Sequence, residues 1–234
     1  MEDKLTISSR TNYSSQHIKA ACFFARKAYE LEKLRIECKE NLHDDREMEY
    51  KSYSTSAIFL SVAFLESIIN EFFSNVSDES IMSFDDNLDA KNVQMIKRLW
   101  SQDVPRTASF SIVRKYEIAL IACEKDTIDK SDVLFNDIKS LIQLRNSLIH
   151  YEPQWNLIYS DEFTNEKGLT LKLKNKFSLS PFAGRGSAFF PERCIGHGCA
   201  EWGIINSIKF VDNFYHKLGM KTTYEIIRSQ LNAK

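Results

Sequence analysis

Arg145 and His150 stand five residues apart in the segment Leu-Arg-Asn-Ser-Leu-Ile-His-Tyr-Glu-Pro, residues 144–153. An arginine guanidinium presents a planar fork of donors that matches the oxygens of a phosphate. Imidazole both accepts and donates a proton near neutral pH, as general acid–base catalysis requires. The two side chains are therefore suited to cleaving RNA without a metal.

The residues before this pair have the apolar spacing of an amphipathic helix, which Pro153 ends. On a helix that turns about 100° per residue, Asn146 and His150 lie about 40° apart, whereas Arg145 lies about 140° from His150. Arg145 must therefore reach around the helix or face a second copy of the motif. The structural alternative is that Arg145 pairs with an acidic neighbour and His150 simply ends a helix, where a cation interacts favourably with the helix dipole.

A second arginine–histidine pair, Arg10 and His17, lies in a polar stretch without an apolar face, so we interpret it as coincidence. The segment from Arg145 to His150 resembles the signature of the HEPN superfamily. There, Arg, a polar residue, three variable residues and His close one helix of an all-α bundle. Residues 64–71, Phe-Leu-Glu-Ser-Ile-Ile-Asn-Glu, are similar to the apolar helix carrying Glu and Asn that many bacterial members place opposite the motif helix.

This resemblance extends over about residues 14–220. It implies a homodimer whose motif helices face each other, with RNA as the substrate. It also implies that the ribose 2′-OH attacks the adjacent phosphorus, with Asn146 orienting Arg145 or His150. The protein would then be a toxin or defence effector, with an antitoxin or another protein as its partner. The alternative is a non-catalytic dimerising module for a partner enzyme or antitoxin. Tyr151, directly after His150, is a further candidate contact to the substrate.

Glu66 and Asn70 share one face of the most apolar segment of the chain. A buried carboxylate without a partner is costly, so Glu66 needs a cation or a hydrogen-bond donor. Arg145 and His150 are the partners we expect, which would place Glu66 in the catalytic site. A purely structural polar bridge would satisfy Glu66 equally well.

Lys172, Lys174 and Lys176 alternate with other residues, so a β-strand would place their three ammonium groups on one side. Such a row suits phosphate contact. The alternative is a strand edge that lysines protect from aggregation. Nearby phenylalanines are expected to belong to the core or an interface rather than to stack on bases.

Cys194, His197 and Cys199 lie close together, and His216 follows further on. A structural zinc site usually has paired Cys-x2-4-Cys knuckles, which this chain lacks. We therefore interpret the cysteines as free buried thiols and expect no metal. The sequence has no Walker loop, GxGxxG or GxSxG motif, and no cofactor is expected.

Helical periodicity predicts an all-α bundle in a single domain over residues 1–234, with residues 1–12 as a flexible tail. Residues 154–192, with few helical repeats, are expected to form an inserted β-hairpin or extended loop. The segment from Ala57 to Phe73 is apolar on nearly every side and should be central. The predicted helices are about 14–42, 48–76, 88–101, 109–124 and 131–151, one around residues 202–215, and a short one at 222–230.

A net charge of −1 means that any RNA site must be a local patch. Five cysteines without a disulfide-rich pattern indicate reduced thiols and a cytoplasmic location. The N-terminus has no secretory signal pattern, and no stretch approaches the ~20 uninterrupted apolar residues of a membrane span. We therefore expect no membrane association.

Overall fold

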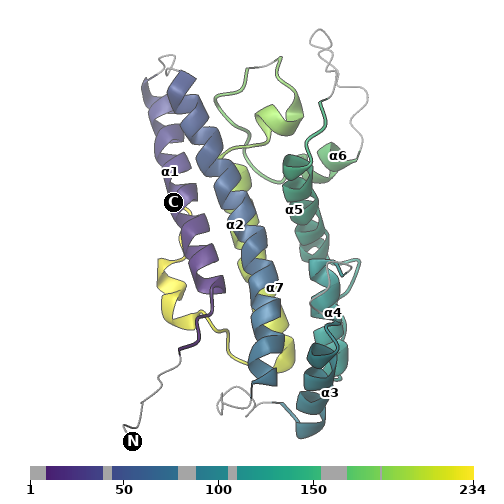
Figure 1. Ribbon diagram of the computed structural model, residues 1–234. Coiled ribbons are helices and arrows are strands. Elements are labelled where there is room, and N and C mark those ends of the chain that lie inside the picture. The colour runs from purple at the N-terminus through teal and green to yellow at the C-terminus, as the bar shows by residue number, and fades with distance from the viewer. Residues whose placement is uncertain (1–8, 39–43, 79–87, 105–109, 154–167, 185) are drawn as a thin grey trace, which may run out of the picture.

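The computed structural model describes residues 9–38, 44–78, 88–104, 110–153, 168–184 and 186–234 (Figure 1). These residues form helices and contain no β-strand, which confirms the prediction of an all-α bundle. Seven α-helices and two short helical turns lie in the described ranges: α1 (Ser14–Cys38), α2 (Asp44–Ser77), α3 (Ala90–Ser101), α4 (Ile112–Ala122), α5 (Val133–Ile149), α6 (Leu169–Leu173), η1 (Phe189–Arg193), α7 (His197–Leu218) and η2 (Glu225–Gln230).

The apolar helix α2 lies at the centre of the bundle. Helices α1, α3, α4, α5 and α7 all pack against it. Because these helices bury apolar stripes against it, α2 has fully buried side chains over about half of its circumference and partly buried ones over the rest. The prediction that it is the central element is confirmed. Its fully buried apolar residues are Ala57, Ile58, Val62, Phe64, Leu65, Ile68, Ile69, Phe72, Phe73 and Val76.

The helices run in alternating directions (Figure 1). Helices α1 and α5 run antiparallel to α2, and α7 runs parallel to it. The end of α5 and the start of α2 therefore lie at the same end of the bundle. A Cβ placed at Gly203 of α7 would lie 3.0 Å from Leu141 of α5 and 3.8 Å from Ser61 of α2. Leu141 and Ser61 therefore occupy the same level of the bundle.

Both ends of α5 are defined by local hydrogen bonds. At its start, the Asp132 carboxylate accepts the backbone N–H of Leu134 at 3.1 Å, as an N-cap residue does. At its end, the backbone N–H of His150 donates to the carbonyl of Asn146 at 2.9 Å, and the helix stops there. The predicted stop before Pro153 is confirmed.

The predicted insertion at residues 154–192 differs from expectation where it is described. Residues 154–167, which include the first expected strand, lie outside the described residues. The second expected strand is instead the short helix α6, and no strand follows it up to residue 192 in the described part. Leu173 is fully buried in the core, so one turn of helix that inserts this side chain replaces the alternating pattern.

Helix α2 is also the one described segment that is long and apolar enough to cross a membrane, over Arg46–Ser77. In the bundle, 56% of its most apolar window is buried against the rest of the protein. The core helix of a soluble protein meets the same criteria of length and composition. The expectation of no membrane association stays a prediction.

The close packing of the 174–184 segment across the start of α7 gives a test of the fold. A Cβ added at Gly198 would lie 2.6 Å from the carbonyl oxygen of Ser178 and 2.9 Å from its backbone nitrogen. We expect Gly198→Ala to lower the free energy of unfolding by about 1–3 kcal/mol, measured by urea denaturation. This loss should appear even though alanine favours a helix over glycine by about 1 kcal/mol.

The matched control is Gly184→Ala, because the nearest atom to a Cβ there is Ser187 Oγ at 3.9 Å. This variant should unfold at the wild-type urea concentration. A Gly198→Ala protein as stable as wild type would contradict the close approach of Ser178 to α7.

Candidate functional site

The two polar residues Asn146 and His150 form an exposed pair at the end of α5. Both side chains are exposed, one turn apart, so they lie on the same outward face as the sequence predicts. The His150 imidazole makes no hydrogen bond to any residue that the structure describes. Its nitrogens are therefore accessible to a substrate.

Arg145 lies on a different side of α5. The residue is half-buried, and its Nε is shielded from solvent without a hydrogen-bond acceptor among the described residues. The alternative of an ion pair with an acidic neighbour finds no partner in the same ranges. A buried guanidinium N–H without an acceptor costs roughly 1–3 kcal/mol. A phosphate could reach this nitrogen only if the side chain moved, because Nε is covered. The predicted phosphate contact of Arg145 stays a prediction.

Tyr151 follows directly beyond the end of the helix. The residue is 46% exposed, and the centroid of its ring lies 6.1 Å from that of Phe190 in η1. Tyr151 therefore links the end of α5 to η1 while keeping part of its ring available. The predicted substrate contact stays a prediction.

Glu66 is bonded to a different cation from the one expected. The Nζ of Lys115, on α4, lies 3.4 Å from Glu66 Oε1 and 3.2 Å from Asn70 Oδ1. Lys115 is only 4% exposed, so this contact serves to satisfy a nearly buried ammonium group. The Glu66 side chain itself is 44% exposed, so the expectation of a buried carboxylate was wrong. Glu66 does have a cationic partner, as predicted, but the expected partners, Arg145 and His150, were wrong.

The levels of the helices explain this difference. Glu66 lies five residues beyond Ser61 on α2, whereas Arg145 lies four residues beyond Leu141 on the antiparallel α5. Because Ser61 and Leu141 are at the same level, Glu66 and Arg145 lie on opposite sides of that level. At 1.5 Å per residue they are separated along the bundle by about 13 Å. Lys115 was missed because a lone lysine in an apolar helix gives no signal in the sequence.

The three lysines after residue 171 do not form a row, because α6 replaces the expected strand. Lys172 Nζ donates to Gln143 Oε1 of α5 at 2.9 Å and remains exposed. Lys176 Nζ lies 2.6 Å from the carboxylate of Asp137, which neutralises it. Lys174 is exposed. The predicted one-sided lysine strand is therefore wrong, and Lys172 is the member placed against the motif helix.

The cysteines near residue 197 are free and buried, as expected. Burial raises the pKa of the Cys194 thiol to about 12 and that of Cys199 well above its ordinary value, so neither is a reactive thiolate. The His197 imidazole lies 3.1 Å from the Ala233 carbonyl through Nε2. Exposed His216 lies 19 residues further along α7, about 28 Å away. The described residues contain no grouping of metal ligands.

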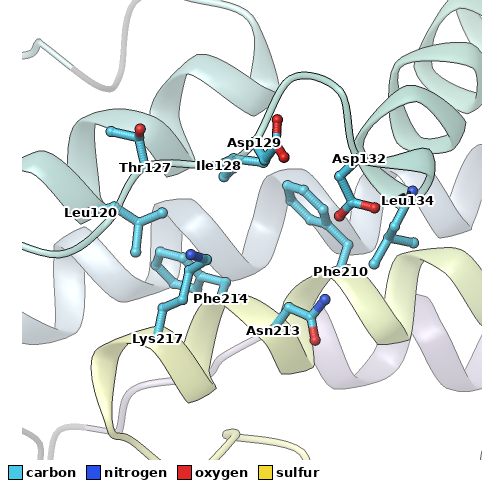
Figure 2. Close-up of a pocket in the computed structure, with 10 residues that line it drawn as sticks. All are labelled: Leu120, Thr127, Ile128, Asp129, Asp132, Leu134, Phe210, Asn213, Phe214 and Lys217. Carbon is cyan, nitrogen blue, oxygen red and sulfur yellow. Dashed lines mark hydrogen bonds between the residues drawn. The ribbon is translucent and has the colours of Figure 1, made fainter.

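A pocket of about 350 Å³ lies at the opposite end of α5 from His150 (Figure 2). Its floor is apolar, formed by Phe210 and Phe214 of α7 with Leu120 and Leu134. Asp129 and Asp132 stand at its edge, beside the start of α5. Sequence reasoning did not identify this pocket, because its floor comes from α7 and its edge from the α4–α5 loop.

The chain matches no protein family model, curated protein or solved structure. The HEPN resemblance therefore rests on the motif residues. The geometry around Arg145, Asn146 and His150 is the basis for a functional proposal.

The Glu66–Lys115 contact predicts a stability effect. Glu66→Gln keeps the side-chain shape but removes the charge that faces buried Lys115. We expect this variant to lower the free energy of unfolding by about 1–2 kcal/mol, measured by urea denaturation. Adding Lys115→Met should recover most of this loss, because it removes the nearly buried ammonium group that has lost its counter-charge.

The control is Glu30→Gln, which breaks the exposed pair between Lys27 and Glu30. This change should alter stability by less than about 0.5 kcal/mol. If Glu66→Gln changed the free energy of unfolding as little as this control, Lys115 would not depend on Glu66 for its burial.

Proposed function

We propose that this protein is a metal-independent endoribonuclease, active as a homodimer, in which Arg145 and His150 act on the scissile phosphate. The observation that carries the proposal is the state of these two side chains at the end of one helix. Arg145 has a shielded guanidinium nitrogen without an acceptor in the described residues, and His150 is exposed and unbonded there. His150 is thus free to contact a phosphodiester, and Arg145 retains a donor that no described residue uses.

In the proposed reaction, the ribose 2′-oxygen attacks the adjacent phosphorus while the bond to the 5′-oxygen breaks. One His150 accepts the proton of the 2′-hydroxyl, and a second histidine gives a proton to the departing 5′-oxygen. Arg145 stabilises the charge on the phosphorane, and Asn146 orients the reacting groups. The products are a 2′,3′-cyclic phosphate and a 5′-hydroxyl.

The need for two copies follows from the directions of the side chains. Arg145 is half-buried and lies about 140° around α5 from exposed His150, so one helix does not present both to a single phosphate. Two copies related by a twofold axis would supply two arginines and two histidines to one cleft. The exposed apolar side chains of Ile149 and Tyr151, at the end of the motif helix, favour such a contact.

Glu66 has no part in this mechanism, because its described contacts are with α4. The role of toxin or defence effector, with an antitoxin or other partner, rests on the motif resemblance. The second candidate is a non-catalytic dimerising module. The same exposed residues, Ile149 and Tyr151, favour it, because an interaction surface needs no chemistry.

Replacing the proposed acid–base group should abolish cleavage without unfolding the protein. His150 is exposed at a helix end, so His150→Ala should leave the circular dichroism spectrum unchanged. We expect it to slow cleavage of total RNA by about 10²–10⁴-fold, with wild-type cleavage unaffected by EDTA and leaving cyclic phosphate ends.

The matched control is His216→Ala, which removes an exposed histidine at the far end of α7. That variant should cleave at the wild-type rate. A folded His150→Ala protein with full activity would contradict the catalytic assignment. If the wild-type protein cleaved no RNA at all, the non-catalytic dimerising module would be the remaining candidate.

Activity should also depend on protein concentration. If each site needs two copies, specific activity should fall upon dilution below the dissociation constant of the dimer. Light scattering across the same dilution series should show the dimer disappear in parallel. A monomer that keeps full specific activity would refute the shared site.

A further inference from the structure

The outward face of α5 carries a continuous polar stripe that leads to His150. Five side chains fall within an arc of about 80° of the helix circumference. Four of them are exposed and Gln143 is half-buried, and none is a carboxylate. They are Asn136, Lys139, Gln143, Asn146 and His150.

The two lysines along this stripe are held in place by neighbouring groups. Lys139 Nζ lies 5.5 Å from the centroid of the Phe135 ring, and Phe135 is itself buried. Lys172 reaches from α6 to Gln143, at the middle of the stripe. These contacts restrict both side chains, which lowers the entropy lost when they bind a phosphate.

The charges next to the stripe favour an anion over only part of its length. Asp137 lies about 140° around α5 from His150, on a different side of the helix, and Lys176 neutralises it. Beyond residue 136 the helix begins at Asp132, with Asp129 close by at the edge of the pocket in Figure 2. These carboxylates would repel a phosphate chain at the start of α5. Exposed Glu152 stands beyond the other end.

We infer that this stripe binds the single-stranded RNA that flanks the scissile bond, with the strand lying along α5 from His150 towards Lys139. The inference rests on the proposed function. Lys139 and His150 are 11 residues apart on the sequence, about 16 Å along the helix. This length accommodates a few extended nucleotides, with Lys172 and Lys139 contacting successive parts of the backbone.

The binding test separates this inference from catalysis. The probe is a ten-nucleotide 2′-O-methyl RNA, which lacks the attacking hydroxyl and cannot be cleaved. The double variant Lys139→Gln with Lys172→Gln should bind this probe several-fold more weakly than the wild-type protein does. The slope of log affinity against log salt should flatten by about 1.4, or 0.7 for each lost contact to a single strand.

The matched control is Lys125→Gln with Lys217→Gln, which removes two exposed lysines outside the stripe. It should leave the salt slope unchanged. If both double variants flatten the slope equally, binding is spread over the surface and the stripe is not the site. The inference would also be overturned if the protein with Lys139→Gln and Lys172→Gln bound the probe as strongly as the wild-type protein does.

A kinetic test uses substrates of two lengths. On a ten-nucleotide RNA, Lys139→Gln should raise KM several-fold with kcat unchanged, whereas a dinucleotide, too short to reach Lys139, should be cleaved equally by variant and wild type. A change in kcat on the dinucleotide would place Lys139 in the reaction rather than on a strand path. If no RNA is cleaved but the probe still binds through Lys139 and Lys172, the proposed function fails and the binding stripe stands.

Discussion

Burial of the apolar surface of α2 is the constraint on which the rest of the bundle depends. At about 25 cal/mol for each Å² of apolar surface removed from water, a helix of this composition is stable only when other helices cover it. Residues from Ala57 to Val76 have fully buried side chains on opposite sides of the axis. Five helices therefore pack against α2, and each turns its polar side outward.

This arrangement decides which side chains of α5 are available for chemistry. Helix α5 packs against α2 and α7 through Leu141 and Leu144, both fully buried. Arg145 follows directly, so its guanidinium nitrogen is drawn out of water, whereas Asn146 and His150 stay in solvent. The same packing that stabilises the helix thus divides the motif between a shielded side and an exposed side.

The near-neutral net charge conceals a local separation of charges. Asp129 and Asp132 gather where α5 begins, and Lys139 and Lys172 lie further along it. Asp137, on a different side of α5 from Lys139, is neutralised by Lys176 at 2.6 Å. At physiological salt, charges further apart than about 8 Å are largely screened. A phosphate chain would therefore respond to these local groups rather than to the total charge.

The sequence by itself determined the all-α class, the central place of α2 and the shared face of Asn146 and His150, because these follow from a helical period within one segment. The tertiary structure decided which side chains from separate segments meet, because no single segment contains that information. Glu66 met Lys115 because antiparallel packing set the levels of α2 and α5. Residues 169–173 form a helix in which Leu169 and Leu173, four residues apart, pack on the core while Leu171 stays exposed, a pattern that a strand would not give. Lys172 reached Gln143, 29 residues earlier in the chain, only because α6 folds back on α5.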